Sequence, residues 1–146
     1  MTSTQRQTAT LLLIALASCV GPPAATEAED SEQLLARIEQ FNEAIREGDV
    51  EKYTDVFVDD FVFTWAPDGQ IYTPEEIFPN VVPTPDHAPS VDELVVRIYG
   101  DAAIVNARMK QLPHEAGVRV TFSFARVESA WKVVAYQSTN ITDPAG

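Results

Sequence analysis

The chain has 146 residues, with 22 acidic and 10 basic side chains and a formal net charge of −12 at pH 7. This length fits one domain, and the acidic balance argues against a nucleic-acid partner or an anionic headgroup surface, both of which are bound through basic patches. Cys19 is the only cysteine, so a disulfide framework, a thiolate zinc site and Cys-x-x-Cys redox chemistry are excluded.

A short apolar run, residues 11–19, follows Arg6 near the start of the sequence. The run is shorter than the about 20 residues that a spanning helix needs, so we predict a cleaved signal peptide over 1–18. Leu16-Ala17-Ser18-Cys19 resembles the lipobox of bacterial lipoproteins. That resemblance implies lipidation of Cys19, attachment to a membrane through acyl chains, and a place in the bacterial cell envelope, facing the periplasm or the cell exterior. The alternative is an ordinary signal-peptide cysteine.

Residues 19–30 are predicted to form an acidic tether, because their prolines and acids leave little that can pack. A folded domain is expected over 31–142. Its first helix is predicted to start from an N-cap at Asp30 or Ser31 and to end at Gly48. The apolar residues of this helix recur at helical spacing: Leu34, Leu35, Ile38, Phe41 and Ile45. A shorter helix capped by Asp49 follows, with Val50, Tyr53, Val56 and Phe57 on its apolar side.

Strand-forming residues dominate the rest of the chain. A first strand is expected at 61–65, before the turn signal Pro67-Asp68-Gly69. Thr73-Pro74-Glu75-Glu76 has the pattern of a capping box that opens a helix, and Pro79 is expected to end that helix and begin an irregular loop over 79–90. Four further strands are predicted, at 94–99, 102–110, 118–127 and 131–139. Helices followed by an antiparallel meander indicate the α+β class, with helices on one face of a curved sheet.

Five short strings occur in order between Leu34 and Thr139. They are Gly48-Asp49-Val50, Asp59-Asp60-Phe61-Val62-Phe63, Asp68-Gly69-Gln70 with the capped 73–77 segment, Gly100 to Val105, and Trp131-Lys132-Val133-Val134 with Gln137. Together they resemble the nuclear-transport-factor-2-like superfamily and, within it, the SnoaL-like group and its domains of unknown function. The resemblance implies a cone-like, cystatin-like α+β roll, in which a curved antiparallel sheet wraps around N-terminal helices and leaves a pocket. It also implies a homodimer formed through the outer sheet face.

The same resemblance suggests ligand-binding residues. Trp65 and Tyr72 flank the first turn and are candidates for the pocket mouth, with core packing as the alternative. Arg108 is placed where some relatives point a side chain into the cavity, and it would attract an anionic group there. Phe122 stands where some relatives have a pocket arginine, with packing in the core beside Phe124 as the alternative, and Gln137 stands where several have histidine or glutamine. For Arg108 the alternatives are exposure on the outer face or an ion pair with Asp59, Asp60 or Asp101.

Two functions follow as hypotheses. The first is a membrane-tethered, non-catalytic domain that binds a small apolar or anionic ligand or serves as a scaffold; it assigns no catalytic residue, no metal and no cofactor. The second is an isomerase or dehydratase of the SnoaL-like type, with His87 or an aspartate as the base and Arg108 holding an oxyanion. Other catalytic signatures, such as a Gly-x-Ser-x-Gly elbow or a glycine-rich phosphate loop, are not found in the sequence.

Overall fold

The computed structural model describes residues 26–65, 68–83, 89–111 and 114–141. Its first helix, α1 (Glu27–Glu47), begins earlier than predicted, so residues 27–30 belong to the helix and not to the tether. The reason is a capping box, in which the Glu29 amide donates to Thr26 Oγ1 (3.3 Å) and the Thr26 amide donates to Glu29 Oε2 (2.7 Å). Gly48 ends α1 as predicted, in the left-handed conformation with φ 66°.

Six strands form one sheet in the order β2-β1-β6-β5-β4-β3. From β3 onward the strands form the predicted antiparallel meander, while β1 pairs with β6 in parallel. This arrangement confirms the α+β class. The strand bounds are β1 (Phe57–Thr64), β2 (Ile71–Tyr72), β3 (Ser90–Tyr99), β4 (Ala102–Gln111), β5 (His114–Val127) and β6 (Ala130–Asn140).

Three strands, β1, β3 and β5, begin four residues earlier than predicted, and β6 begins one residue earlier. β1 includes Phe57, which we had assigned to the second helix, because α2 (Val50–Val56) ends one residue before it. β3 begins at Ser90 and not at Leu94, because an irregularity in its pairing with β4, where Glu93 has φ 52°, lets the strand continue across charged residues. A non-glycine residue with positive φ is uncommon, so the sequence does not signal this bulge.

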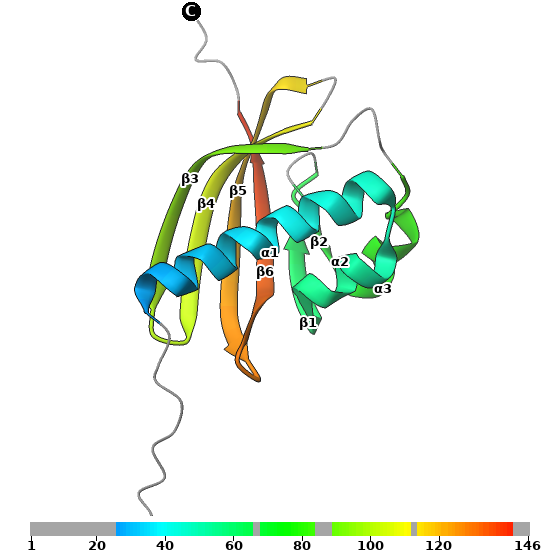
Figure 1. The fold of residues 1–146 in the computed structure, drawn as a ribbon. Helices are drawn as coiled ribbons and strands as arrows, with labels where there is room; N and C mark the ends of the chain where they lie inside the picture. Colours follow the sequence, from blue (N-terminus) through cyan, green and yellow to red (C-terminus); the bar gives the residue numbers. More distant parts are fainter. Residues whose placement is uncertain (1–25, 66–67, 84–88, 112–113, 142–146) are drawn as a thin grey trace, which may run out of the picture.

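The helices lie on one side of the curved sheet (Figure 1). α1 crosses the face of β3 to β6, while α2, α3 (Pro74–Ile77) and the 3₁₀ turn η1 (Phe78–Asn80) gather beside β1. Pro79 therefore lies inside a helical turn that continues α3, where we had expected the helix to end. The core fills the space between α1 and the inner sheet face; its most buried members include Leu34, Phe61, Val105, Phe122, Phe124, Trp131 and Val133.

A buried ion pair fixes the start of α1 to the sheet. Asp30 accepts hydrogen bonds from Arg126 Nη2 (2.6 Å) and from the Trp131 indole (3.2 Å). The Arg126 guanidinium lies 4.2 Å from the centre of the Trp131 ring and also reaches Asp101. The hydrogen bond from Arg126 lowers the pKa of Asp30, because it favours the charged carboxylate. Asp30 is thus a structural residue of the domain.

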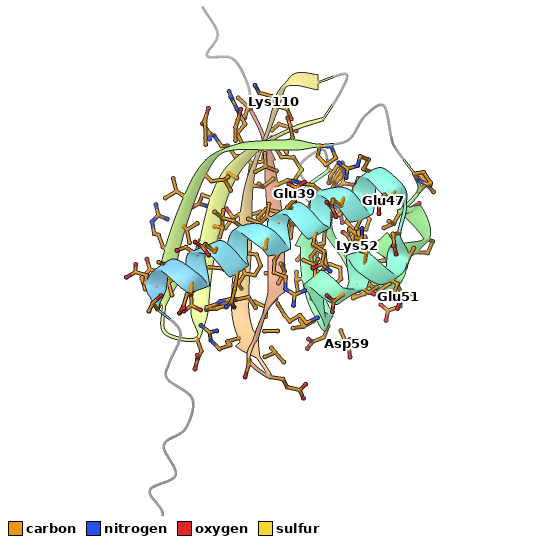
Figure 2. The ribbon with its side chains drawn as sticks, in the orientation of Figure 1. Glu39, Glu47, Glu51, Lys52, Asp59 and Lys110 are labelled. Carbon is orange, nitrogen blue, oxygen red and sulfur yellow. The ribbon has the colours of Figure 1, made fainter. Side chains whose placement is uncertain are left out.

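A second set of charges joins α1, α2 and β6. Asp55 accepts hydrogen bonds from Lys132, Arg37 and Gln40, and these bonds hold its pKa well below the ordinary value. Lys52, shown beside Glu47 where α1 and α2 meet (Figure 2), pairs with that carboxylate at 2.7 Å. These contacts fix α2 against α1 and therefore position the end of the molecule where the pocket lies.

Candidate functional site

A pocket of about 430 Å³ opens between the C-terminal half of α1, the segment from α3 to Val82, and the end of the sheet at β1 and β2. These elements lie together at one end of the sheet (Figure 1). The pocket is lined by Phe41, Ile45, Tyr53, Phe63, Trp65, Tyr72, Glu76, Ile77, Asn80, Val81, Val82, Met109 and Tyr136. Its volume is that of a small-molecule site, and its lining is mainly aromatic and aliphatic.

Strand register builds the aromatic wall of the pocket. Phe63 of β1 pairs with Tyr72 of β2 on one side and with Tyr136 of β6 on the other, so the three side chains share one face. The Phe63 and Tyr136 rings stack with centroids 4.8 Å apart and planes within 1° of parallel. Trp65 stacks on the other side of Phe63 at 5.7 Å. Phe63 is therefore the central ring of a row of stacked aromatic side chains, which gives this wall of the pocket an apolar surface.

The turn between β1 and β2 fixes the mouth of the pocket. Asp68 Oδ1 accepts from the Gln70 amide (2.9 Å), and Asp68 Oδ2 accepts from the Tyr72 hydroxyl (2.6 Å). This last hydrogen bond raises the pKa of Tyr72 and lowers that of Asp68. The Trp65 amide also donates to the Gln70 carbonyl (3.1 Å). The Tyr72 hydroxyl is therefore engaged at the rim, and its ring faces the pocket.

Two further phenols lie deeper in the wall. Tyr136 is buried and its hydroxyl donates to Met109 Sδ, 3.7 Å away. Burial raises the pKa of Tyr136, and the nearby Tyr53 phenol adds to the rise. Burial likewise raises the pKa of Tyr53, whose ring stacks on Phe57 at 4.9 Å. Both phenols are protonated at neutral pH, as an ordinary tyrosine with a pKa of about 10 is, and can act as hydrogen-bond donors.

The other polar groups of the lining are used within the fold. Glu76 is the one charged residue among the described lining side chains, and its Oε2 accepts from the Thr73 amide at 2.8 Å. Asn80 Nδ2 donates to the Glu76 carbonyl at 2.8 Å. The capping box that the sequence predicts at 73–76 is thus confirmed, and it uses the carboxylate that comes nearest to the pocket.

The five predicted ligand-binding residues lie in three different places: the pocket lining, the buried core and the outer face of the sheet. Trp65 and Tyr72 line the pocket. Phe122 also points to the inner face, but it is fully buried in the core, where its ring contacts Phe41 and Tyr136 at 5.5 and 4.9 Å. It supports the pocket wall from behind and does not line the pocket.

Arg108 lies on the outer sheet face, which corrects the prediction that it points into the cavity. Ala107 and Met109 on either side of it are buried, so alternation along β4 turns Arg108 outward. Its guanidinium pairs with Asp92 through two hydrogen bonds of 2.7 Å and with Glu93 at 3.2 Å. The Arg108 bond lowers the pKa of Asp92 to about 2. Arg108 therefore forms an ion pair, as the alternative prediction had it, but its partners are Asp92 and Glu93. The partners that we had expected were Asp59, Asp60 or Asp101.

Gln137 is exposed on the outer face as well, between Thr121 and Thr64 in the register. The pairing of β5 with β6 explains this. Ser123 and Phe124 oppose Ala135 and Val133, so β6 has one extra residue at Val134. This bulge makes Tyr136, and not Gln137, face the pocket.

Other predicted residues lie elsewhere in the sequence. Cys19 and His87 fall outside the described residues. Among the residues that the structure describes, no group of His, Cys, Asp or Glu is arranged to hold a metal ion, and no helix is long and apolar enough to cross a bilayer.

Residues 34–142 match the model of the SnoaL-like domain. No curated protein matches the chain. Similar solved structures include an NTF2-like protein from Cytophaga hutchinsonii (21% identity, 76% of this chain and 98% of that one, TM-score 0.66) and a cystatin-like protein of unknown function from Nostoc punctiforme (15%, 80% and 93%, TM-score 0.67). A protein named as a candidate dehydratase of the NTF2-like family, from Streptomyces avermitilis, is also similar (16%, 81% and 100%, TM-score 0.66). At these identities the likeness shows the fold alone.

Proposed function

Because the chain belongs to the SnoaL-like domain family, whose fold is compatible with many functions, we propose its role from the pocket itself: this domain binds a small, uncharged, mainly apolar molecule. The observation that carries the proposal is the wall formed by Phe63, Tyr136, Trp65 and Tyr72 around a volume of about 430 Å³. Flat rings offer a large contact area to a flat ligand, and few polar groups oppose its desolvation.

The anionic ligand of the sequence hypothesis is not part of this proposal. A buried anion needs a cationic partner, and Arg108 is paired on the opposite face of the sheet. Among the described lining residues none is cationic, and the Glu76 carboxylate would repel an anion.

The enzyme hypothesis loses its oxyanion holder for the same reason. General acid–base catalysis also needs a group that can exchange a proton with the substrate near neutral pH. Among the described lining residues, the phenols of Tyr53 and Tyr136 have raised pKa values and the Glu76 side chain caps α3, while His87 lies outside the described residues. We therefore favour binding without turnover.

The test uses the full chain with Cys19→Ala, which cannot be acylated at that position, and the neutral fluorescent probe N-phenyl-1-naphthylamine. Val81→Trp should fill the pocket, because Val81 lines it from the segment after η1. The matched control is Val62→Trp on the outer face, where 43% of the residue is exposed. We expect saturable fluorescence with the Cys19→Ala chain and with the Val62 variant, and its loss with the Val81 variant. Equal binding by all three would place the probe elsewhere and refute the proposal.

We further propose that Cys19 is acylated and holds the domain on a membrane of the bacterial cell envelope. The support is the lipobox-like sequence and its short apolar run. Cys19→Ala should release the protein from the membrane fraction and abolish labelling by a palmitate analogue. Unchanged labelling of that variant would contradict the assignment.

A homodimer through the outer sheet face is the last part of the proposal. Val62, Val95 and Ile104 expose apolar side chains on that face, where side chains alternate outward from neighbouring strands. Sedimentation of the Cys19→Ala chain should give a dimer, and Ile104→Glu should shift it to the monomer. A monomer before the second substitution would refute this interface.

A further inference from the structure

One buried hydrogen-bond donor in the pocket has only a weak acceptor. The Tyr136 hydroxyl donates to the thioether of Met109 at 3.7 Å, and a thioether sulfur accepts hydrogen bonds weakly. Buried phenol hydroxyls usually find an oxygen or nitrogen partner, because leaving such a donor poorly bonded costs stability. Both residues line the pocket, so a bound molecule can reach the place where the better acceptor is missing.

The position of this donor is fixed. The Tyr136 ring stacks on Phe63 at 4.8 Å and meets the edges of Phe122 at 4.9 Å, while Phe41 lies 5.7 Å away. A ring held on several sides cannot swing away from the pocket, so its hydroxyl is preorganised and loses little entropy when it binds a ligand.

A second phenol stands near the first. Tyr53 also lines the pocket, and its ring lies 5.5 Å from Phe41, the same ring that Tyr136 contacts. Within the described part of the chain, no hydrogen bond of the Tyr53 hydroxyl is found to compete with a ligand. The two phenols are the polar groups at the deep end of an otherwise apolar wall.

The charges around the two phenols determine which kind of hydrogen-bond acceptor a bound ligand must carry. Both phenols are protonated at neutral pH, as ordinary tyrosines are, and burial raises their pKa values further, so they donate. A carboxylate ligand would meet Glu76 and no cation among the described lining residues. A neutral acceptor, such as a ketone, aldehyde or ester oxygen, satisfies the donor without burying a charge.

We propose that Tyr136, assisted by Tyr53, recognises the carbonyl oxygen of an uncharged ring compound whose apolar body lies against the aromatic wall of the pocket. This inference rests on the proposed function, and it adds the chemical class of the ligand. In the complex the Tyr136 hydroxyl exchanges its contact with the Met109 sulfur for a hydrogen bond to the ligand oxygen.

The experiment measures displacement of N-phenyl-1-naphthylamine from the full Cys19→Ala chain by 2-acetonaphthone and by 2-ethylnaphthalene. These two molecules share a ring system and differ in the carbonyl. The quantity compared is the ratio of their affinities. Tyr136→Phe removes the donor and keeps the ring, and it should lower the ratio roughly three- to tenfold, the range of one hydrogen bond. The matched control Tyr99→Phe, an exposed tyrosine of β3 that is not among the described lining residues, should leave the ratio unchanged.

Met109→Leu gives a second measurement with nearly the same side-chain volume. It removes the competing sulfur, so the ratio should stay the same or rise. An unchanged ratio in Tyr136→Phe, or a fall in Met109→Leu to the Tyr136→Phe value, would overturn the inference while leaving pocket binding in place. If neither naphthalene displaces the reporter, the proposed function itself fails and this inference fails with it.

Discussion

Replacing Phe63 by alanine tests the pocket wall and the fold together. The Phe63 residue is 7% exposed and contacts the rings of Tyr136, Trp65 and Tyr72. Phe→Ala substitutions in cores cost about 3–5 kcal/mol. One side of this ring already borders the pocket, so fewer contacts are lost than at a fully enclosed site. We therefore expect a loss of about 3 kcal/mol in the free energy of unfolding, at the low end of that range.

The assay is urea unfolding followed by circular dichroism, with thermal melting beside it. For a domain of about 110 residues, 3 kcal/mol corresponds to a fall of roughly 10 °C in Tm. Val62→Ala is the matched control, because Val62 is the preceding residue of β1, is 43% exposed and points to the other face; its cost should stay below about 1 kcal/mol. Equal losses for the two variants would show that the inner face of β1 is not packed as described.

Three further predictions concern stability. Asp55 has a lowered pKa in the fold, so its contribution is complete above its unfolded pKa of about 4 and is lost as the pH falls below that value; the difference between the urea midpoints of the unaltered chain and Asp55→Asn should be constant from pH 6 to 5 and should narrow as the pH is lowered from 4 to 2. Gly48→Ala should cost more than about 2 kcal/mol, because a Cβ there would overlap the Pro83 ring, whereas Gly100→Ala, with a similar φ and open space, should cost about 1 kcal/mol; equal melting shifts would refute the clash. Asn42→Leu should raise stability by about 1 kcal/mol in the same melts, because Asn42 Oδ1 is buried with no hydrogen-bond partner among the described residues; a drop in stability would reveal a partner that the Asn42 amide needs.

Sequence patterns predicted the elements well and their ends less well. The helical spacing of Leu34, Ile38 and Phe41 and the glycine at 48 correctly placed the body and the end of α1. The start was wrong because two capping signals lie close together, and Thr26 with Glu29 forms the reciprocal pair while Asp30 turns inward to Arg126. Which acid becomes buried depends on a residue almost a hundred positions away, and local patterns do not contain that information.

The sequence predicted only some of the residues that line the candidate site, because strand pairing between distant parts of the chain decides the others. Trp65 and Tyr72 flank a recognisable turn, so their neighbourhood follows from local sequence. Tyr136 and Met109 were missed, because strand alternation decides which side of the sheet they face. The extra residue at Val134 reverses that alternation within β6, and the sequence does not mark it with a glycine or a proline. The prediction that Arg108 points into the cavity was wrong for a similar reason. Pairing between β3 and β4 brings Asp92 opposite Arg108, and local sequence does not show this pairing.

The long helix α1 separates the start of the described fold from the pocket. The chain enters the fold at Thr26, and Ile45 borders the ligand chamber, eighteen positions after Glu27. At 1.5 Å per residue these two points are about 27 Å apart. A pull on the preceding chain would be borne first by the Asp30, Arg126 and Trp131 cluster at the near end. In the tethered, ligand-binding domain that we propose, mechanical load and ligand exchange would therefore act at opposite ends of α1.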